Sequence, residues 1–111
     1  MKLAIIGSRG ITNIELEKYI TSDVTEIVSG GALGVDTVAR EFAGVNGITL
    51  VEFLPQYEKY GRGAPLVRNK EIVNYADKVL AFWDGKSRGT KYVIEYAAKI
   101  NKPCEVVILN S

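Results

Sequence analysis

Short apolar runs alternate with stretches of helical periodicity along this chain, and no other feature limits its folds so strongly. The runs occupy residues 3–6, 26–28, 49–53, 78–82 and 105–109. Strands that alternate with helices form βαβ units, which build parallel sheets covered by helices. The sequence therefore predicts one α/β domain over residues 1–111, a three-layer sandwich around a mostly parallel five-stranded sheet.

Helix signals fill the segments between these runs. Thr12 and Glu15 match a capping box, and an apolar stripe follows them. After Val35, apolar residues recur at the spacing of one helix face. Pro65 suits the first turn of a later helix. The predicted helices are residues 12–20, 35–43, 65–75 and 90–101.

The crossovers between parallel strands are right-handed, so every loop from a strand to a helix falls on one edge of the sheet. With the first strand in the centre, we predict the strand order 3-2-1-4-5. The direction of winding then reverses between the first and fourth strands. Ligands of open α/β sheets bind beyond the carboxyl ends of the strands at such a reversal. A ligand site is therefore expected there.

Several residue types are scarce. Cys104 is the single cysteine, so an intramolecular disulfide is excluded and a reducing cytoplasm suits the chain. Residues 1–7 resemble a buried strand more than a signal peptide, and no apolar run approaches the roughly 20 residues that span a bilayer. The chain has no histidine. We therefore expect no metal, no cofactor and no membrane partner, and any catalysis must use carboxylates, Lys, Arg or Tyr.

The charges are unevenly distributed. Eight basic and three acidic residues lie between Lys59 and Lys91, an excess of five positive charges in a chain of net charge +1. This asymmetry favours an anion site built from the second half of the chain. An ordinary solvated surface is the alternative.

The segment Gly30-Gly31-Ala32-Leu33-Gly34 connects the second apolar run to a predicted helix. Glycines let the backbone approach a ligand closely, and a helix N-terminus offers unpaired N–H groups at the positive end of its dipole. These features favour a bound phosphate, although a tight turn without a ligand would also need glycines. Asp36 either caps the helix or binds a hydroxyl group of a ribose or base.

A second loop follows the fourth run. Residues 85–87 imitate the tail of a P-loop, but Leu80 stands where that motif requires its first glycine, so a Walker A site is excluded. Hydroxyl and amide groups at the start of the next helix remain available to a ligand. The candidate ligand contacts in this loop are Asp84, Ser87, Gly89 and Thr90.

A third loop, Gly7-Ser8-Arg9-Gly10, follows the first run and is too short for a dinucleotide fingerprint by itself. Three loops that converge on one edge are nevertheless less expected by chance than any one of them. Arg68 and Asn69 either form an exposed polar face of their helix or reach back to the crevice. In the second case the guanidinium would clamp a phosphate through two parallel hydrogen bonds.

These residues together resemble a known family. Residues 29–36 read SGGALGVD, and with Ala39 they are similar to the SGGAxGxDxxA signature of the SLOG superfamily. Residues 68–70 and 87–90 follow in the expected order, and residues 7–9 match the opening GSR. The resemblance spans essentially the whole chain and is closest to YspA-like and DNA-processing-protein-A-like members. It implies a Rossmann-like fold, a nucleotide-derived ligand and frequent self-association as a homodimer.

The same superfamily contains the "lonely guy" phosphoribohydrolases, whose motif is PGGxGTxxE. Val93 stands at the position of their essential glutamate, and residues 84–87 depart from the PGG element. Glu95 lies about 200° around a helix from Val93, so it does not substitute for that glutamate. The resemblance therefore favours a binding or sensing domain over a hydrolase.

Three functions remain as hypotheses. The first is binding or sensing of a phosphorylated nucleotide-derived small molecule. The second is nucleotide N-glycosidic hydrolysis, for which Asp36, Asp84 and Glu95 are the candidate catalytic carboxylates. The third is binding of single-stranded DNA, which ranks last because a net charge of +1 provides little basic surface.

Overall fold

The computed structural model describes residues 1–31 and 34–109. Its five strands form one parallel sheet in the order β3-β2-β1-β4-β5, which confirms the predicted topology. The strands are β1 (Lys2–Gly7), β2 (Glu26–Ser29), β3 (Thr49–Glu52), β4 (Lys78–Trp83) and β5 (Cys104–Ile108). The helices are α1 (Val35–Asn46), α2 (Tyr57–Tyr60), α3 (Ala64–Tyr75) and α4 (Arg88–Lys99), with 3₁₀ turns η1 (Leu16–Lys18) and η2 (Gly61–Gly63).

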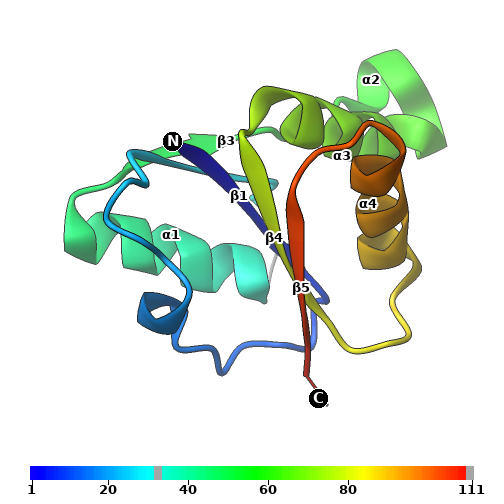
Figure 1. Ribbon diagram of the computed structural model, residues 1–111. Coiled ribbons are helices and arrows are strands. Elements are labelled where there is room, and N and C mark those ends of the chain that lie inside the picture. The colour runs from blue at the N-terminus through cyan, green and yellow to red at the C-terminus, as the bar shows by residue number, and fades with distance from the viewer. Residues whose placement is uncertain (32–33, 110–111) are drawn as a thin grey trace.

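Helices cover both faces of the sheet, as in a Rossmann-like sandwich. Figure 1 shows α1 and η1 on one face, and α3 and α4 on the other. The side chains of β1 divide accordingly: Leu3 and Ile5 belong to the core beneath α1, whereas Ala4 and Ile6 belong to the core beneath α3 and α4. A strand buried on both faces needs a continuous apolar run, which explains why β1 is recognisable from sequence.

α1 follows the predicted pattern. Val35, Ala39 and Ala43 are buried at intervals of four residues and face the sheet. The helix ends at Gly47, whose φ of 65° and ψ of 28° give the left-handed C-cap that glycine adopts without a Cβ penalty. The apolar stripe therefore fixes the orientation of α1, and its N-terminus comes to lie at the carboxyl edge of the sheet.

The helix predicted for residues 12–20 is wrong, because only the 3₁₀ turn η1 forms there. The carboxylate of Glu15 pairs with Lys18 Nζ at 2.6 Å and does not complete a capping box. Ile11 and Leu16 are both buried in the core beneath α1. Burial of these two side chains from a non-helical segment outweighs the local capping signal.

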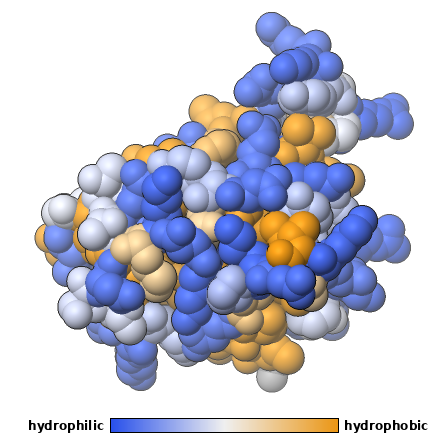
Figure 2. All heavy atoms as spheres, turned by 45° about the horizontal axis from the view of Figure 1, so that its top comes forward, coloured by the Kyte–Doolittle hydropathy of each residue, from blue (hydrophilic) through white to orange (hydrophobic). Residues whose placement is uncertain are grey.

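The segment between β3 and α3 contains the short helix α2 and the turn η2. Figure 2 shows a largely hydrophilic projection at the upper right, where Figure 1 places α2. Pro65 lies in the first turn of α3, as predicted. Within residues 1–31 and 34–109, the structure has no helix that is both long and apolar enough to cross a membrane.

Candidate functional site

A cleft of about 480 Å³ opens at the carboxyl ends of β1 and β4, where the winding of the sheet reverses. Most of the residues proposed from sequence as ligand contacts line it. They are Gly7, Ser8, Arg9, Gly30, Asp36, Arg68, Asn69, Asp84, Ser87, Gly89 and Thr90. The three loops and the α3 side chains therefore converge, although their convergence does not by itself identify a ligand.

Ser8 joins the loop after β1 to the loop after β4. Its backbone N–H donates to Phe82 O at 3.1 Å, and its Oγ accepts from the backbone N–H of Asp84 at 3.3 Å. Gly7 allows Val35 and Phe82 to pack closely beside this loop, because a Cβ at Gly7 would lie 2.5 Å from Val35 Cγ2 and 2.8 Å from Phe82 O. The N-terminus of α1 thus packs directly against the end of β1.

The loop from β4 to α4 is folded around the Asp84 carboxylate. Its Oδ1 accepts the backbone N–H groups of Lys86 and Ser87, both at 2.8 Å. The N–H groups of Ser87 and Lys86 hold the pKa of this carboxyl below its usual value. Ser87 then caps α4, because its Oγ accepts from Thr90 N. Asp84 is therefore ionised at neutral pH and can accept further hydrogen bonds but not donate them.

Two residues predicted as phosphate contacts, Gly31 and Gly34, do not line the cleft, and both lie close to other parts of the chain. Gly31 has a φ of 71°, and a Cβ there would lie 2.6 Å from Leu54 Cδ2. Gly34 has a φ of 78°, and its Cβ would lie 2.4 Å from the carbonyl oxygen of Arg9. Ala32, also proposed as a contact, lies outside the described residues.

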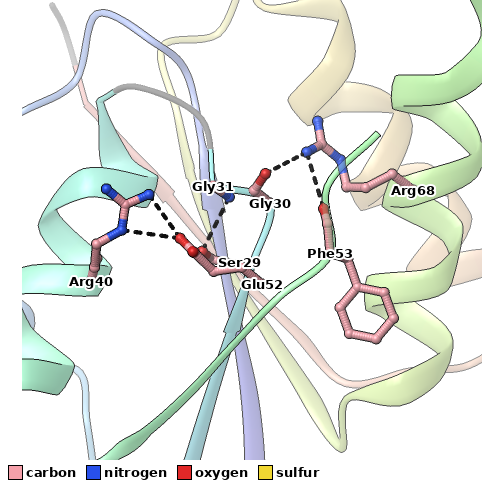
Figure 3. A network of polar contacts seen from close by, with 7 residues as sticks. All are labelled: Ser29, Gly30, Gly31, Arg40, Glu52, Phe53 and Arg68. Atoms are coloured by element: carbon pink, nitrogen blue, oxygen red, sulfur yellow. Dashed lines mark hydrogen bonds and ion pairs between the residues drawn. The ribbon is translucent and has the colours of Figure 1, made fainter. Parts of the chain in front are cut away.

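Arg68 reaches from α3 to the backbone of two loops, as Figure 3 shows. Its Nη1 donates to Gly30 O at 2.7 Å and to Phe53 O at 3.4 Å, and its Nε donates to Asn69 Oδ1 at 2.8 Å. Nε and Nη1 are therefore engaged within the protein, and the two-bond clamp on a phosphate stays a prediction. Within the described residues, these hydrogen bonds leave Nη2 as the guanidinium nitrogen that a ligand could reach. Burial lowers the pKa of Arg68, and the nearby Asp36 carboxylate opposes that effect.

A second arginine supports the same glycine segment from the other side. Arg40 of α1 donates from Nε and Nη2 to Glu52 Oε2 at 3.1 and 2.8 Å, and Figure 3 shows this pair beside Gly31. Gly31 N in turn donates to Ser29 Oγ at 3.4 Å. The described part of this loop is therefore bracketed by α1, β3 and α3.

The candidate catalytic carboxylates do not all face the cleft. Asp36 is 8% exposed and lines it together with Asp84. Glu95 is exposed on α4 and does not line the cleft. Val93, two residues earlier, is 2% exposed and faces the cleft.

Sequence reasoning missed the apolar side chains of the cleft. Ile6, Pro65, Ile72 and Val93 line it with apolar surface, and Gly10 of the predicted third loop also lines the cleft. Hydrophobic periodicity identifies residues that face inward, but it does not separate a core residue from one that lines a pocket. The lining of the cleft therefore combines apolar side chains with polar loops.

No group of three or more His, Cys, Asp or Glu side chains that could hold a metal ion occurs in residues 1–31 and 34–109. Comparison with known proteins identified no matching family model, curated protein or solved structure. The chemistry of this cleft must therefore be inferred from its own residues.

Proposed function

We propose that the chain binds or senses a phosphorylated, nucleotide-derived small molecule in this cleft. The observation that carries the proposal is the start of α4 at the cleft wall. Gly89 and Thr90 line the cleft in the first helical turn, and that turn contains no carboxylate. Thr90 N is already bound to Ser87 Oγ, so the positive end of the helix dipole and the N–H groups before Thr90 are what favour an anion at such a place.

The charges around α4 support the same location for a phosphate. Arg88 is the first residue of the helix, Lys86 precedes it, and Arg9 and Arg68 line the cleft. Cations beside the positive end of a helix dipole favour a bound anion, and the Asp84 carboxylate, which bonds Lys86 N and Ser87 N, offsets only part of this charge. α1 differs, because Asp36 already places a carboxylate in its first turn.

The rest of the cleft suits the sugar and base of a nucleotide. Asp36 and the ionised Asp84 offer acceptors for hydroxyl donors, and the apolar side chains of the lining suit a flat heterocycle. A cavity of about 480 Å³ is within the range of small-molecule sites. We further propose that the chain belongs to the SLOG superfamily and that it acts in the reducing cytoplasm.

Binding without turnover is favoured over hydrolysis. An N-glycosidic hydrolase needs a carboxyl that can hold or move a proton at the ligand. Asp84 is held in its ionised form and Glu95 lies outside the cleft, while the apolar Val93 occupies the wall. Asp36 is the one remaining carboxylate of the three candidates for that role.

The test is a thermal-shift screen against nucleoside monophosphates, ADP-ribose and NAD, compared with single-stranded oligonucleotides. A ligand at about 100 times its Kd stabilises by about 2.7 kcal/mol, which is a shift of several degrees. Incubation with each hit, followed by mass spectrometry, should return unchanged ligand. Product formation would instead support the hydrolase, and oligonucleotide binding that falls with added salt would support the DNA-binding alternative.

The sharpest variant is Gly89→Asp, because a Cβ at Gly89 meets no atom within 4 Å. The new carboxylate should leave the fold intact and remove the ligand-dependent shift by occupying the anion site. Gly44→Asp is the matched control, since Gly44 is equally open and lies in α1 away from the lining. A ligand shift that survives Gly89→Asp, or no shift from any nucleotide, would overturn the proposal.

A further inference from the structure

The two edges of the sheet differ in how they are protected. At β3, Glu52 is held by Arg40 and places a charge on the edge. At β5, Glu105 is paired with Lys78, but Val106 and Ile108 are apolar and are 39% and 65% exposed. Charged residues commonly guard edge strands against pairing with another chain, and β5 has one such charge beside two exposed apolar side chains. In Figure 1, β5 is the outer strand, and no other element is drawn across it.

The hydrogen bonds between β4 and β5 show which backbone groups of β5 are unused by the sheet. Val79 N donates to Pro103 O at 2.9 Å, and Leu109 N donates to Trp83 O at 2.8 Å. Together with the parallel register, these bonds direct the odd-numbered residues of β5 toward β4. The N–H and C=O groups of Cys104, Val106 and Ile108 therefore point away from β4.

We propose that β5 pairs with β5 of a second copy of this chain, antiparallel and centred on Val106. The three outward-pointing residues are symmetric about Val106, so one two-fold axis pairs Val106 with itself and Cys104 with Ile108. Glu105 then lies opposite Val107, and no like charges face each other directly. The edge is thus self-complementary, as an isologous interface requires.

The flank of α4 adds apolar surface beside this strand pair. Tyr96 faces α3, because its hydroxyl donates to Asn74 Oδ1 at 3.1 Å. Ile94 and Ala98 lie two residues from Tyr96 on either side, about 200° around the helix, and so on the flank away from α3. A two-fold axis normal to the sheet keeps both copies of α4 on one face, where these flanks would meet.

Disulfide trapping tests the register. In a Cys104→Ser background, Val106→Cys should form a covalent dimer under mild oxidation, because residues of a hydrogen-bonded antiparallel pair have Cα atoms about 5.5 Å apart, within disulfide range. Glu105→Cys in the same background is the control, since its nearest symmetry mate is diagonal to it. Equal trapping at both positions would contradict the register.

Sedimentation velocity over a range of concentrations tests the interface itself. The unmodified chain should show a concentration-dependent shift to twice its monomer mass. Val106→Lys should remove that shift, because two lysines would meet at the axis, while its circular dichroism stays unchanged. Val45→Lys, at an 86% exposed site on α1, should dimerise normally. A monomer at every concentration, or a dimer unaffected by Val106→Lys, would refute the proposal, whatever ligand the cleft binds.

Discussion

Replacing Gly34 with alanine should destabilise the protein far more than the same change at other glycines. Gly34 precedes α1 with a φ of 78° and a ψ of −123°, a conformation that L-residues rarely adopt. Its new Cβ would also lie 2.4 Å from the Arg9 carbonyl oxygen. A backbone atom cannot rotate away as a side chain can, so either α1 or the loop after β1 must move.

Two other glycines separate these contributions. Gly44 lies inside α1 with no atom within 4 Å of an added Cβ, so Gly44→Ala should stabilise by about 1 kcal/mol through helix propensity. Gly47 is equally open but has a φ of 65°, so Gly47→Ala should cost about 1–2 kcal/mol. Gly34→Ala combines backbone strain with overpacking of about 1–3 kcal/mol, and should cost about 2–5 kcal/mol in all.

Urea unfolding monitored by far-ultraviolet circular dichroism measures all three free energies. A loss of about 2–5 kcal/mol is a large share of the 5–15 kcal/mol typical of a domain, so Gly34→Ala should be partly unfolded at modest urea concentrations. If Gly34→Ala is no less stable than Gly47→Ala, the close approach to Arg9 does not constrain the fold and the reasoning fails.

Three further changes test other parts of the structure by urea unfolding. Leu80→Ala should cost about 2–5 kcal/mol, because this side chain is buried in β4. Arg40→Gln should cost only about 0.2–1 kcal/mol, since its ion pair with Glu52 is partly exposed, and the cost should shrink in high salt. The depressed pKa of Asp84 stabilises the fold above the ordinary aspartate pKa of about 3.9, and this contribution is lost as pH falls through the lower folded value. Asp84→Asn should therefore be less stable than the unmodified chain at pH 7, with a smaller difference at pH 3.

The sheet was predictable because burial on two faces leaves a strong pattern. β1 and β4 must be apolar after their first residue, and α1 must carry an apolar stripe, so their places and order follow from general rules of connection. The same kind of reasoning predicted a helix over residues 12–20 that the structure does not contain. A capping box is a local signal of about 1 kcal/mol, and burial of Ile11 and Leu16 exceeds it.

The loops that form the site were predictable from the sequence, but the hydrogen bonds and close contacts among their residues were not. Glycine at positions 30 and 34 signals close backbone approach, yet only the structure shows that Gly34 approaches Arg9. Arg68 likewise has the right residue type for a phosphate, but its bonds to Gly30 and Phe53 depend on contacts far apart in sequence. Such contacts leave no local trace.

The central place of β1 has a consequence for synthesis of the chain. Lys2 N bonds to Asp77 Oδ2, 75 positions along the chain, and β4 begins directly after that residue. At roughly 5–20 residues per second, the ribosome adds β4 roughly 4–15 s after β1. During that interval one edge of β1 is bare, and the face that α3 and α4 later cover is incomplete. Slower translation would lengthen this exposure, so the yield of folded protein should depend on elongation rate and on chaperones that shelter nascent apolar strands.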